Sequence, residues 1–388
     1  MVEAMAPAGV GFQLTDEQQM LQRMAREFTT KEIIPVAADY DEKATFPEDI
    51  FRKALEIGLV NMNIPEAYGG VGASPLEECL VAEEFGYGCT GISTSISLNS
   101  LAALPLILAG SDAQKQYWLG ERLMGKGEFA SYGVTEAAAG SNVAGIQTRA
   151  EKKNGAYIIN GSKTFITNAS HASFFCVFAK TDPAAGHRGM SCFVVERDMP
   201  GVSTGKKFDK LGQRASDTAE IVFENVEVPA ENLIGQEGAG FYLAMKVFDY
   251  SRPGVAAAAV GLQRRCLEES VRYAREREAF GVPIYQHHAI GHKIADMAIH
   301  YQASRLLVWQ AATQLSSGQI DPKLPAFAKA FAADKATQAA VDAVQVFGGY
   351  GYMKEYPVEK LLRDVKIFQI YEGTSEIQRN IIVRELFK

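Results

Sequence analysis

The chain has 388 residues, 47% of them hydrophobic and 22% charged, so it is long enough for two or three globular domains. Its formal net charge is −7 and it has no long basic run, which argues against nucleic acid as a partner. The 5 cysteines are scattered and form no C-x-x-C pair, so a reducing compartment is expected rather than a disulfide framework or a zinc site.

Targeting and membrane segments are not expected. Residues 1–11 lack both the basic segment and the apolar core of a secretory signal, and no apolar run is judged long enough to span a membrane. The simplest expectation is a cytoplasmic protein if the source is bacterial, or a mitochondrial matrix protein if it is eukaryotic.

Residues 1–126 are predicted to form an all-helical domain. Thr15 with Gln18, and Ser111 with Gln114, have the spacing of helix capping boxes. Pro47 suits the first turn of another helix, which should end at Gly58. Apolar periodicity predicts further helices at 75–85, 92–108 and 111–119.

Residues 127–233 have a different pattern, with short apolar runs separated by glycine and proline. Asn154-Gly155 and Asn160-Gly161 are typical of hairpin turns. We expect strands at 157–159, 163–167, 174–178, 192–195 and 218–223. The segment is predicted to be an antiparallel β-barrel or sandwich.

Residues 234–388 return to helical periodicity. Pro253 is predicted to kink or restart the first of these helices after Arg252. Alanines crowd two of the helices and permit close packing in an antiparallel bundle. The expected helices are 241–276, 288–315, 325–346, 357–371 and 375–386. The complete chain is therefore predicted to be a multidomain α+β protein, helical at both ends with an antiparallel β-barrel in the middle.

An acidic residue, Glu372, follows an apolar run at 367–371. Ser375 and Gln378 have capping-box spacing, so a new helix should begin there. Glu372 is thus predicted to lie in a tight turn between two helices, beside apolar side chains. This environment raises a carboxyl pKa toward neutrality and suits a general base. The alternative is an ordinary solvated carboxylate.

The segment Tyr371-Glu372-Gly373-Thr374-Ser375 resembles the catalytic segment of the acyl-CoA dehydrogenases, especially the medium-chain branch. The helical, β and helical order is also similar to the three-domain plan of that family. The resemblance implies bound FAD, with Glu372 removing a proton from the α-carbon of an acyl-CoA while a hydride leaves the next carbon. In the isovaleryl branch the base lies at the position of Ser251, which cannot serve as a carboxylate.

Two further segments resemble flavin contacts of the family. In the loop at 132–141, the Thr135 hydroxyl and backbone amides would bind the isoalloxazine ring, and Ser141 would reach the pyrophosphate. In the strand at 165–167, Phe165 would lie against the ring and Thr167 would bond near N5. Taken without the family, both segments could be an ordinary loop and strand. The residues expected at the flavin are Tyr132, Val134, Thr135, Gly140, Ser141, Phe165, Ile166, Thr167, Thr374 and Glu376.

Other cofactor contacts are expected across a subunit boundary. Arg277 matches an arginine that reaches the flavin pyrophosphate of a neighbouring subunit, and the segment 345–349 matches the one that holds the adenosine half. Such sharing implies at least a dimer, and the resemblance implies a homotetramer built as a dimer of dimers. The residues expected in these contacts are Arg277, Phe280, His287, His288, Gln345, Val346, Gly348 and Gly349.

Substrate contacts also follow from the resemblance. Asp249 and Arg252 match residues that contact the coenzyme A part, although a structural salt bridge is the alternative. The backbone amide of Glu372 would hold the thioester carbonyl in an oxyanion-type site. The expected substrate-binding residues are Ser141, Asp249, Arg252, Tyr371, Glu372 and Gly373.

The chain departs from its relatives at two places. Ala137-Ala138 replaces a usual Pro-Gly, and Ala138 would be strained if that glycine has a positive φ. Ser97 and Leu98 stand where a medium-chain relative has Glu and Gly, and residues 92–101 contain no arginine for a dicarboxylyl substrate. A straight short-to-medium acyl chain is predicted.

The resemblance therefore predicts a FAD-dependent acyl-CoA dehydrogenase of fatty acid β-oxidation that makes trans-2-enoyl-CoA. Its electrons would pass to an electron-transfer flavoprotein. Two alternatives stay open. One is an oxidase or flavin monooxygenase of the same fold, which passes electrons to oxygen. The other is a non-catalytic acyl-CoA-binding scaffold, for which the altered loop at 137–142 is the argument.

Overall fold

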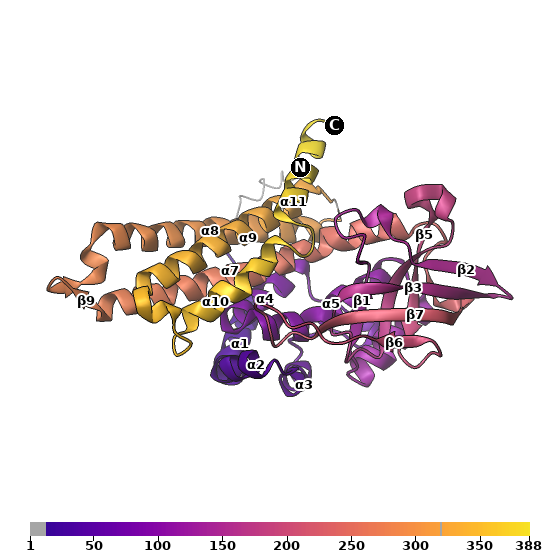
Figure 1. The fold of residues 1–388 in the computed structure, drawn as a ribbon, viewed down its shortest axis with the longest axis horizontal. Coiled ribbons are helices and arrows are strands. Elements are labelled where there is room, and N and C mark those ends of the chain that lie inside the picture. The colour runs from indigo at the N-terminus through magenta and orange to yellow at the C-terminus, as the bar shows by residue number, and fades with distance from the viewer. Residues whose placement is uncertain (1–12, 319) are drawn as a thin grey trace, which may run out of the picture.

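The computed structural model describes residues 13–318 and 320–388, so the predictions made for 1–11 lie outside the described residues. A helical part at the N-terminus packs beside a β part and a long helical bundle (Figure 1). The helices of the N-terminal part are α1 Asp16–Phe28, α2 Ala37–Lys43, α3 Glu48–Glu56, α4 Pro75–Gly88, α5 Thr90–Ala109 and α6 Asp112–Gln114, the last continuing as a π-helix over Lys115–Gly125.

Capping interactions define where several of these helices begin. Thr15 and Gln18 form both hydrogen bonds of the predicted capping box at α1, and Ser111 and Gln114 do so at α6. The helix predicted at 111–119 is α-helical only over Asp112–Gln114, because the π-helical turns take over at Lys115. Capping boxes are local hydrogen-bond patterns, which is why the sequence is sufficient to identify them.

Helix α5 is 20 residues long and apolar enough, by length and composition alone, to cross a membrane. The expectation that no apolar run reaches that length is therefore wrong. More than half of the α5 window, 56%, is buried inside the protein. The Asn99 side chain at its centre accepts from the backbone amide of Ala130 and donates to the carbonyl of Glu128. The helix is thus packed in the interior, where it anchors the chain that enters the β part.

The β part is one eight-stranded sheet in the order β6-β7-β3-β2-β4-β5-β8, with β1 beside β4. Pairing is antiparallel except between β1 and β4 and at the single pair Arg149–Lys180 of β2 and β4. Its strands are β1 Ala130–Gly133, β2 Arg149–Lys153, β3 Ala156–Thr167, β4 Phe174–Lys180, β5 Met190–Glu196, β6 Val202–Thr204, β7 Thr218–Pro229 and β8 Leu233–Ile234.

One of the two predicted hairpin turns is present. Asn154 and Gly155 have φ values of 51° and 85° and connect β2 to β3. Asn160-Gly161 is not a turn, so that prediction is wrong: both residues lie inside β3, at a shift in its register with β7. Gly161 is required there by a close approach, since a Cβ would lie 2.6 Å from the Thr148 hydroxyl oxygen.

The C-terminal part is a bundle of long helices that extends away from the sheet (Figure 1). Helix α7 continues unbroken through Pro253, so the predicted restart after Arg252 is wrong. Both residues are buried in the helix, and this burial offsets the hydrogen bond lost with the proline amide. The elements are α7 Gly240–Glu276, the pair β9 Glu278–Ala279 and β10 Val282–Pro283, α8 His288–Ser316, α9 Lys323–Phe347, α10 Pro357–Val365 and α11 Ser375–Leu386.

Helices α4 and α7 join the two helical parts at very short range. A Cβ at Gly261 of α7 would lie 2.0 Å from the carbonyl oxygen of Glu83, and one at Gly86 of α4 would lie 2.3 Å from the carbonyl oxygen of Ala258. Cys79 of α4 also belongs to the apolar core of the bundle. The contact therefore depends on two glycines that let the helix backbones touch.

Replacing Gly261 by alanine should destabilise the protein by about 1–3 kcal/mol, because the added methyl forces α4 and α7 apart. Gly254→Ala, in the same helix, is the matched control, since a Cβ at Gly254 meets no atom within 4 Å. The control should be neutral or stabilising by about 0.5–1 kcal/mol. Chemical unfolding of both variants measures the effect, and equal stabilities would contradict the proposed role of the close contact.

Candidate active site

Glu372 lies in the connection between a 3-10 turn, Lys366–Gln369, and α11. Glu372 and Gly373 are both left-handed, with φ values of 54° and 86°, so the predicted tight turn is present. The predicted capping box of Ser375 and Gln378 is wrong: Thr374 caps α11 by accepting from the amide of Ile377, 3.2 Å away.

The Glu372 carboxyl group is partly buried and accepts a hydrogen bond from a side chain of α7. The Ser251 hydroxyl of α7 donates to its Oε2 atom over 2.7 Å. Burial raises the pKa of Glu372 above its ordinary value, while the Ser251 hydrogen bond and the charges of Arg252 and Lys329 act in the opposite direction. The carboxylate is therefore oriented by a hydroxyl and is a stronger proton acceptor than a solvated glutamate.

The turn itself is held from two helices. The Gln378 amide of α11 donates to the carbonyl oxygens of Glu372 and Gly373, both at 3.0 Å. The Lys329 ammonium of α9 also donates to the Gly373 carbonyl. Burial lowers the pKa of Lys329 to about 8. A left-handed conformation is costly for Glu372, although not for Gly373, and these hydrogen bonds keep the turn in place.

All three parts of the chain meet around this turn. The ring of Tyr132, from β1, lies 6.0 Å from the ring of Phe248, one turn before Ser251 on α7. The Gln213 amide donates to the Tyr371 hydroxyl at 3.4 Å and accepts from the Thr94 hydroxyl of α5 at 3.1 Å. Tyr371 therefore contacts the N-terminal and middle parts, while Glu372 contacts α7.

The loop that follows β1 is tied down by a buried ion pair. Glu136 lies 2.7 Å from the Lys163 ammonium and also accepts from the amide and hydroxyl of Thr148. Lys163 donates to the Val134 carbonyl as well, and the Thr164 amide donates to the Thr135 carbonyl. The backbone of the predicted flavin loop is thus bound to β3 at successive residues.

The altered part of this loop is unstrained. Neither Ala137 nor Ala138 has a positive φ, so the strain considered for Ala138 does not arise. Gly140 and Ser141 are exposed, and a Cβ at Gly140 would meet no atom within 4 Å. The backbone at these residues faces open space.

The end of β3 carries the second predicted flavin segment. Phe165 is 64% exposed and has a φ of 57°, at an irregularity in the pairing of β3 with β7. Ile166 between its neighbours is buried, and the Thr167 carbonyl accepts from the Ser131 hydroxyl of β1 at 2.8 Å. The irregular strand end thus presents an aromatic ring outward and keeps Thr167 beside β1.

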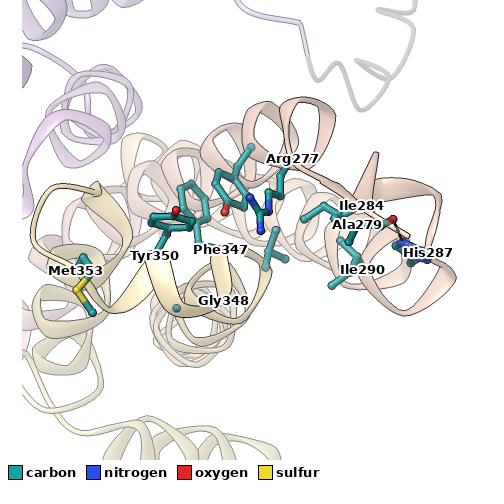
Figure 2. Close-up of a pocket in the computed structure, with 12 residues that line it drawn as sticks. Arg277, Ala279, Ile284, His287, Ile290, Phe347, Gly348, Tyr350 and Met353 are labelled. Carbon is teal, nitrogen blue, oxygen red and sulfur yellow. Dashed lines mark hydrogen bonds between the residues drawn. The ribbon is translucent and has the colours of Figure 1, made fainter. Parts of the chain in front are cut away.

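A second group of predicted residues lies at the far end of the bundle. A pocket of about 690 Å³ lies there and is lined by Arg277, His287, Val346, Gly348 and Gly349. Figure 2 shows Arg277, His287 and Gly348 around it. Three other predicted residues do not line it and are exposed, namely Phe280, His288 and Gln345. Thr374 and Glu376 lie elsewhere, at the start of α11.

The chain does not bring these two groups together. Ser251, beside Glu372, and Glu276, which precedes Arg277, are 25 residues apart on one continuous helix. At 1.5 Å per residue they are separated by roughly 37 Å. In Figure 1 the β9 hairpin, next to Arg277, forms one tip of the bundle, and the sheet lies at the other end.

Sequence comparisons identify the relatives of this chain. Profiles of the acyl-CoA dehydrogenase N-terminal, middle and C-terminal domains match residues 15–126, 131–226 and 238–387. A "probable medium-chain specific acyl-CoA dehydrogenase 2, mitochondrial" of Caenorhabditis briggsae is 44% identical over 384 residues, 97% of this chain and 92% of the relative. An acyl-CoA dehydrogenase of Bacillus subtilis (strain 168) is 42% identical over 374 residues, 96% of this chain and 98% of the relative.

A comparison of structures points to the same family as the sequence comparisons. Butyryl-CoA dehydrogenase from Megasphaera elsdenii has a TM-score of 0.95 and 39% identity, covering 97% of this chain and all of that one. The chain belongs to the acyl-CoA dehydrogenase family. It is therefore a FAD-dependent acyl-CoA dehydrogenase, with the helical, β and helical domains of that fold.

The residues at the tip of the bundle fit a phosphate-bearing part of FAD. At the tip of the bundle, a Cβ at Gly348 or Gly349 would meet no atom within 4 Å, so their backbone is open to a ligand. Among the described residues, the Arg277 guanidinium contacts the ring of Tyr350 and no carboxylate within ion-pair distance. An uncommitted guanidinium beside open glycine backbone suits a phosphate group.

Asp249 and Arg252 pair with each other in this chain. Their oxygen and nitrogen atoms are 2.6 Å apart, and the Arg252 side chain is only 6% exposed. The Arg252 Nε atom is buried without a hydrogen-bond partner among the described residues. The salt-bridge alternative considered from the sequence is therefore present, and a contact with coenzyme A stays a prediction.

Four residues of the site escaped the sequence-based prediction. Ser251 was considered only as a failed base and Gln378 only as a capping-box partner of Ser375, while Lys163 and Lys329 were not considered. Lys329 offered a usable signal, since it is a lone charge in the run AFAKAFAA. A cation inside a helix face made of alanine and phenylalanine must find a buried partner. The partner here is a backbone carbonyl from a distant segment, which no local pattern reveals.

Proposed function

We propose that this acyl-CoA dehydrogenase acts on straight short-to-medium acyl-CoA substrates, makes trans-2-enoyl-CoA in β-oxidation, and uses Glu372 as its base. The observation that carries the proposal is the partly buried Glu372 carboxyl, whose Oε2 atom accepts from Ser251 over 2.7 Å. A carboxylate with a raised pKa retains an abstracted proton better than a solvated one. When bound, FAD supplies the acceptor for the hydride that leaves the substrate.

The backbone at Glu372 can serve the substrate carbonyl. Among the described residues, the Glu372 amide donates to no protein acceptor, whereas the neighbouring Tyr371 amide donates to the Ile367 carbonyl. A free amide beside the base can hold the thioester oxygen and stabilise the negative charge that forms there on proton removal. The left-handed turn keeps this amide and the carboxyl on one short segment.

The cofactor site is proposed to be shared between subunits of a homotetramer. Arg277, Gly348 and Gly349 would hold the phosphate and adenosine part of a partner's FAD, while Thr135 and Thr167 would hold the ring in their own subunit. The roughly 37 Å between the two groups supports sharing, because one chain cannot present both to one cofactor. Phe280, 97% exposed, and Tyr352, 81% exposed, lie at the same tip and would be covered by a partner.

The domain boundaries proposed from the sequence are 1–126, 127–233 and 234–388. The helical segments that support the first boundary end at Gly125, and strands follow from Ala130 to Ile234. The long helices then begin with α7 at Gly240. For electrons, we propose transfer to an electron-transfer flavoprotein. Negligible oxygen consumption during turnover is expected, and rapid consumption would favour an oxidase or a monooxygenase.

Replacing Glu372 by glutamine should leave the yellow flavin bound but slow its anaerobic bleaching by acyl-CoA by about 10²–10⁴-fold, because the base is lost. Glu355→Gln, an exposed carboxylate on the same part of the chain, is the control and should bleach at the wild-type rate. A visible spectrum before and after addition of butyryl- or octanoyl-CoA measures both effects. Unchanged bleaching in Glu372→Gln would refute the assigned role.

Mixing two inactive variants tests the shared site. Glu372→Gln and Arg277→Ala homo-oligomers should each be inactive, the second through loss of FAD. In a mixed dimer, one site combines the intact Glu372 of one chain with the intact Arg277 of the other. Random co-assembly should therefore restore about a quarter of the wild-type activity. No recovery in demonstrated mixed oligomers would mean that one chain holds the whole cofactor.

Chain-length preference follows from helix α5. Leu98 is buried and Ser97 partly buried on this helix, and a leucine in place of glycine shortens the space beside it. Steady-state rates with butyryl-, octanoyl- and palmitoyl-CoA should be highest for one of the two shorter substrates. Palmitoyl-CoA as the best substrate would contradict the proposal.

A further inference from the structure

A buried lysine next to the catalytic turn has no obvious counter-ion. The Lys329 residue is fully buried in α9, and its ammonium donates to the Gly373 carbonyl. Among the described residues, no carboxylate lies within ion-pair distance of it. A buried ammonium is strongly disfavoured unless hydrogen bonds and opposite charge compensate it.

The charges that face Lys329 come from four elements, and most of them are already engaged. Asp334 of α9 is neutralised by Arg379 at 2.6 Å and accepts from Gln369 and Ser375. Glu376 of α11 is exposed to solvent. Arg252 of α7 is paired with Asp249. The groups acting on Lys329 are Glu372, Arg252, Asp334 and Glu376, of which the first is the strongest.

Glu372 is therefore the remaining counter-charge of Lys329. The groups that act on Glu372 in turn are the Ser251 hydroxyl and the charges of Arg252 and Lys329. Tyr132 of β1 and Tyr371 also lie within electrostatic range, and burial raises the pKa of both phenols, so they stay neutral. Because the charge of Arg252 is matched by Asp249, the Lys329 ammonium and the Glu372 carboxylate balance each other before the reaction.

We propose that Lys329 is a positioning residue for the base, holding the turn through Gly373 and keeping Glu372 ionised until it takes the substrate proton. The proposal rests on Glu372 being the base, as proposed above. In the step itself the proton moves from the α-carbon to the Glu372 carboxylate, and the electron pair stays on the substrate. Lys329 exchanges no proton. Its charge, no longer balanced by Glu372, then favours the negative charge that forms on the substrate.

Three variants test this inference. Lys329→Met removes the charge at similar length, Lys329→Arg keeps it, and Lys335→Met removes an outer lysine of α9 that contacts the Phe331 ring. The rate of anaerobic flavin bleaching by butyryl-CoA is measured as a function of pH. In Lys329→Met the acidic limb of the pH–rate profile, where Glu372 becomes protonated, should move up by about one pH unit. The loss of a nearby positive charge raises the pKa of Glu372. Lys329→Arg and Lys335→Met should keep the wild-type limb.

A measurement without turnover accompanies the pH profile. Thermal unfolding midpoints of the wild type and Lys329→Met are compared at about pH 7 and about pH 9.5. Burial lowers the pKa of Lys329 to about 8, so the unfolded chain binds more protons above that pH, and wild-type stability rises relative to the variant. The wild-type midpoint should rise relative to that of the variant as the pH rises; a constant difference would mean that Lys329 binds as many protons in the folded as in the unfolded chain, and would overturn the desolvated ammonium from which the inference is argued.

The outcomes separate the inference from the function on which it rests. A lower rate in Lys329→Met with an unmoved acidic limb would overturn the inference and leave only a structural lysine. If Lys329→Met does not fold, the Lys329→Arg variant decides: an acidic limb of its pH–rate profile that differs from the wild-type limb would overturn the inference. If Glu372→Gln still bleaches at the wild-type rate, the proposed function itself fails, whatever the lysine variants show.

Discussion

The hydrogen bond between the Ser251 hydroxyl and the Glu372 carboxylate is the interaction around which this site is built. Removing a carboxylate from water is costly, and the protein can retain it only with compensating donors and charges. Ser251 supplies the donor, and Arg252 and Lys329 supply charge. The compensation is incomplete, so the pKa stays raised. That residual imbalance suits the group to its proposed role as a base, because full compensation would leave a carboxylate with little affinity for a proton.

The carboxylate needs a fixed backbone as well as fixed charges. Glu372 and Gly373 adopt two successive left-handed conformations, and their carbonyls accept from Gln378. α11 therefore stabilises the turn that precedes it. α9 and α7 add Lys329 and Ser251, so three helices distant in sequence determine the position of one side chain. The short α4–α7 contact through Gly86 and Gly261 then joins this assembly to the N-terminal domain.

The far tip of the bundle has the opposite character. Its pocket is lined by Arg277, His287 and an open pair of glycines, and aromatic side chains around it face solvent. Within the described residues, the tip has groups that suit a phosphate ligand and lies far from Glu372, while the other end has the proposed base but lacks these groups. The proposed sharing of a cofactor between two copies would explain both ends with one arrangement, and oligomerisation would then be a condition for activity rather than an addition to it.

The sequence by itself determined the elements that depend on neighbouring residues. The capping boxes at Thr15 and Ser111, the Asn154-Gly155 turn and the apolar context of Glu372 are all local patterns, and the family could be read from Tyr371–Ser375 and the order of domains. Predictions failed where distant packing prevailed. Asn160-Gly161 became part of a strand because Asn160 pairs with Arg149 of β2 and Gly161 with Phe223 of β7, and Pro253 stayed helical where it and Arg252 are buried. Only the tertiary structure could bring Ser251, Lys329 and Gln378 to Glu372, since hydrogen bonds and charges act through space between segments that no spacing in the chain relates.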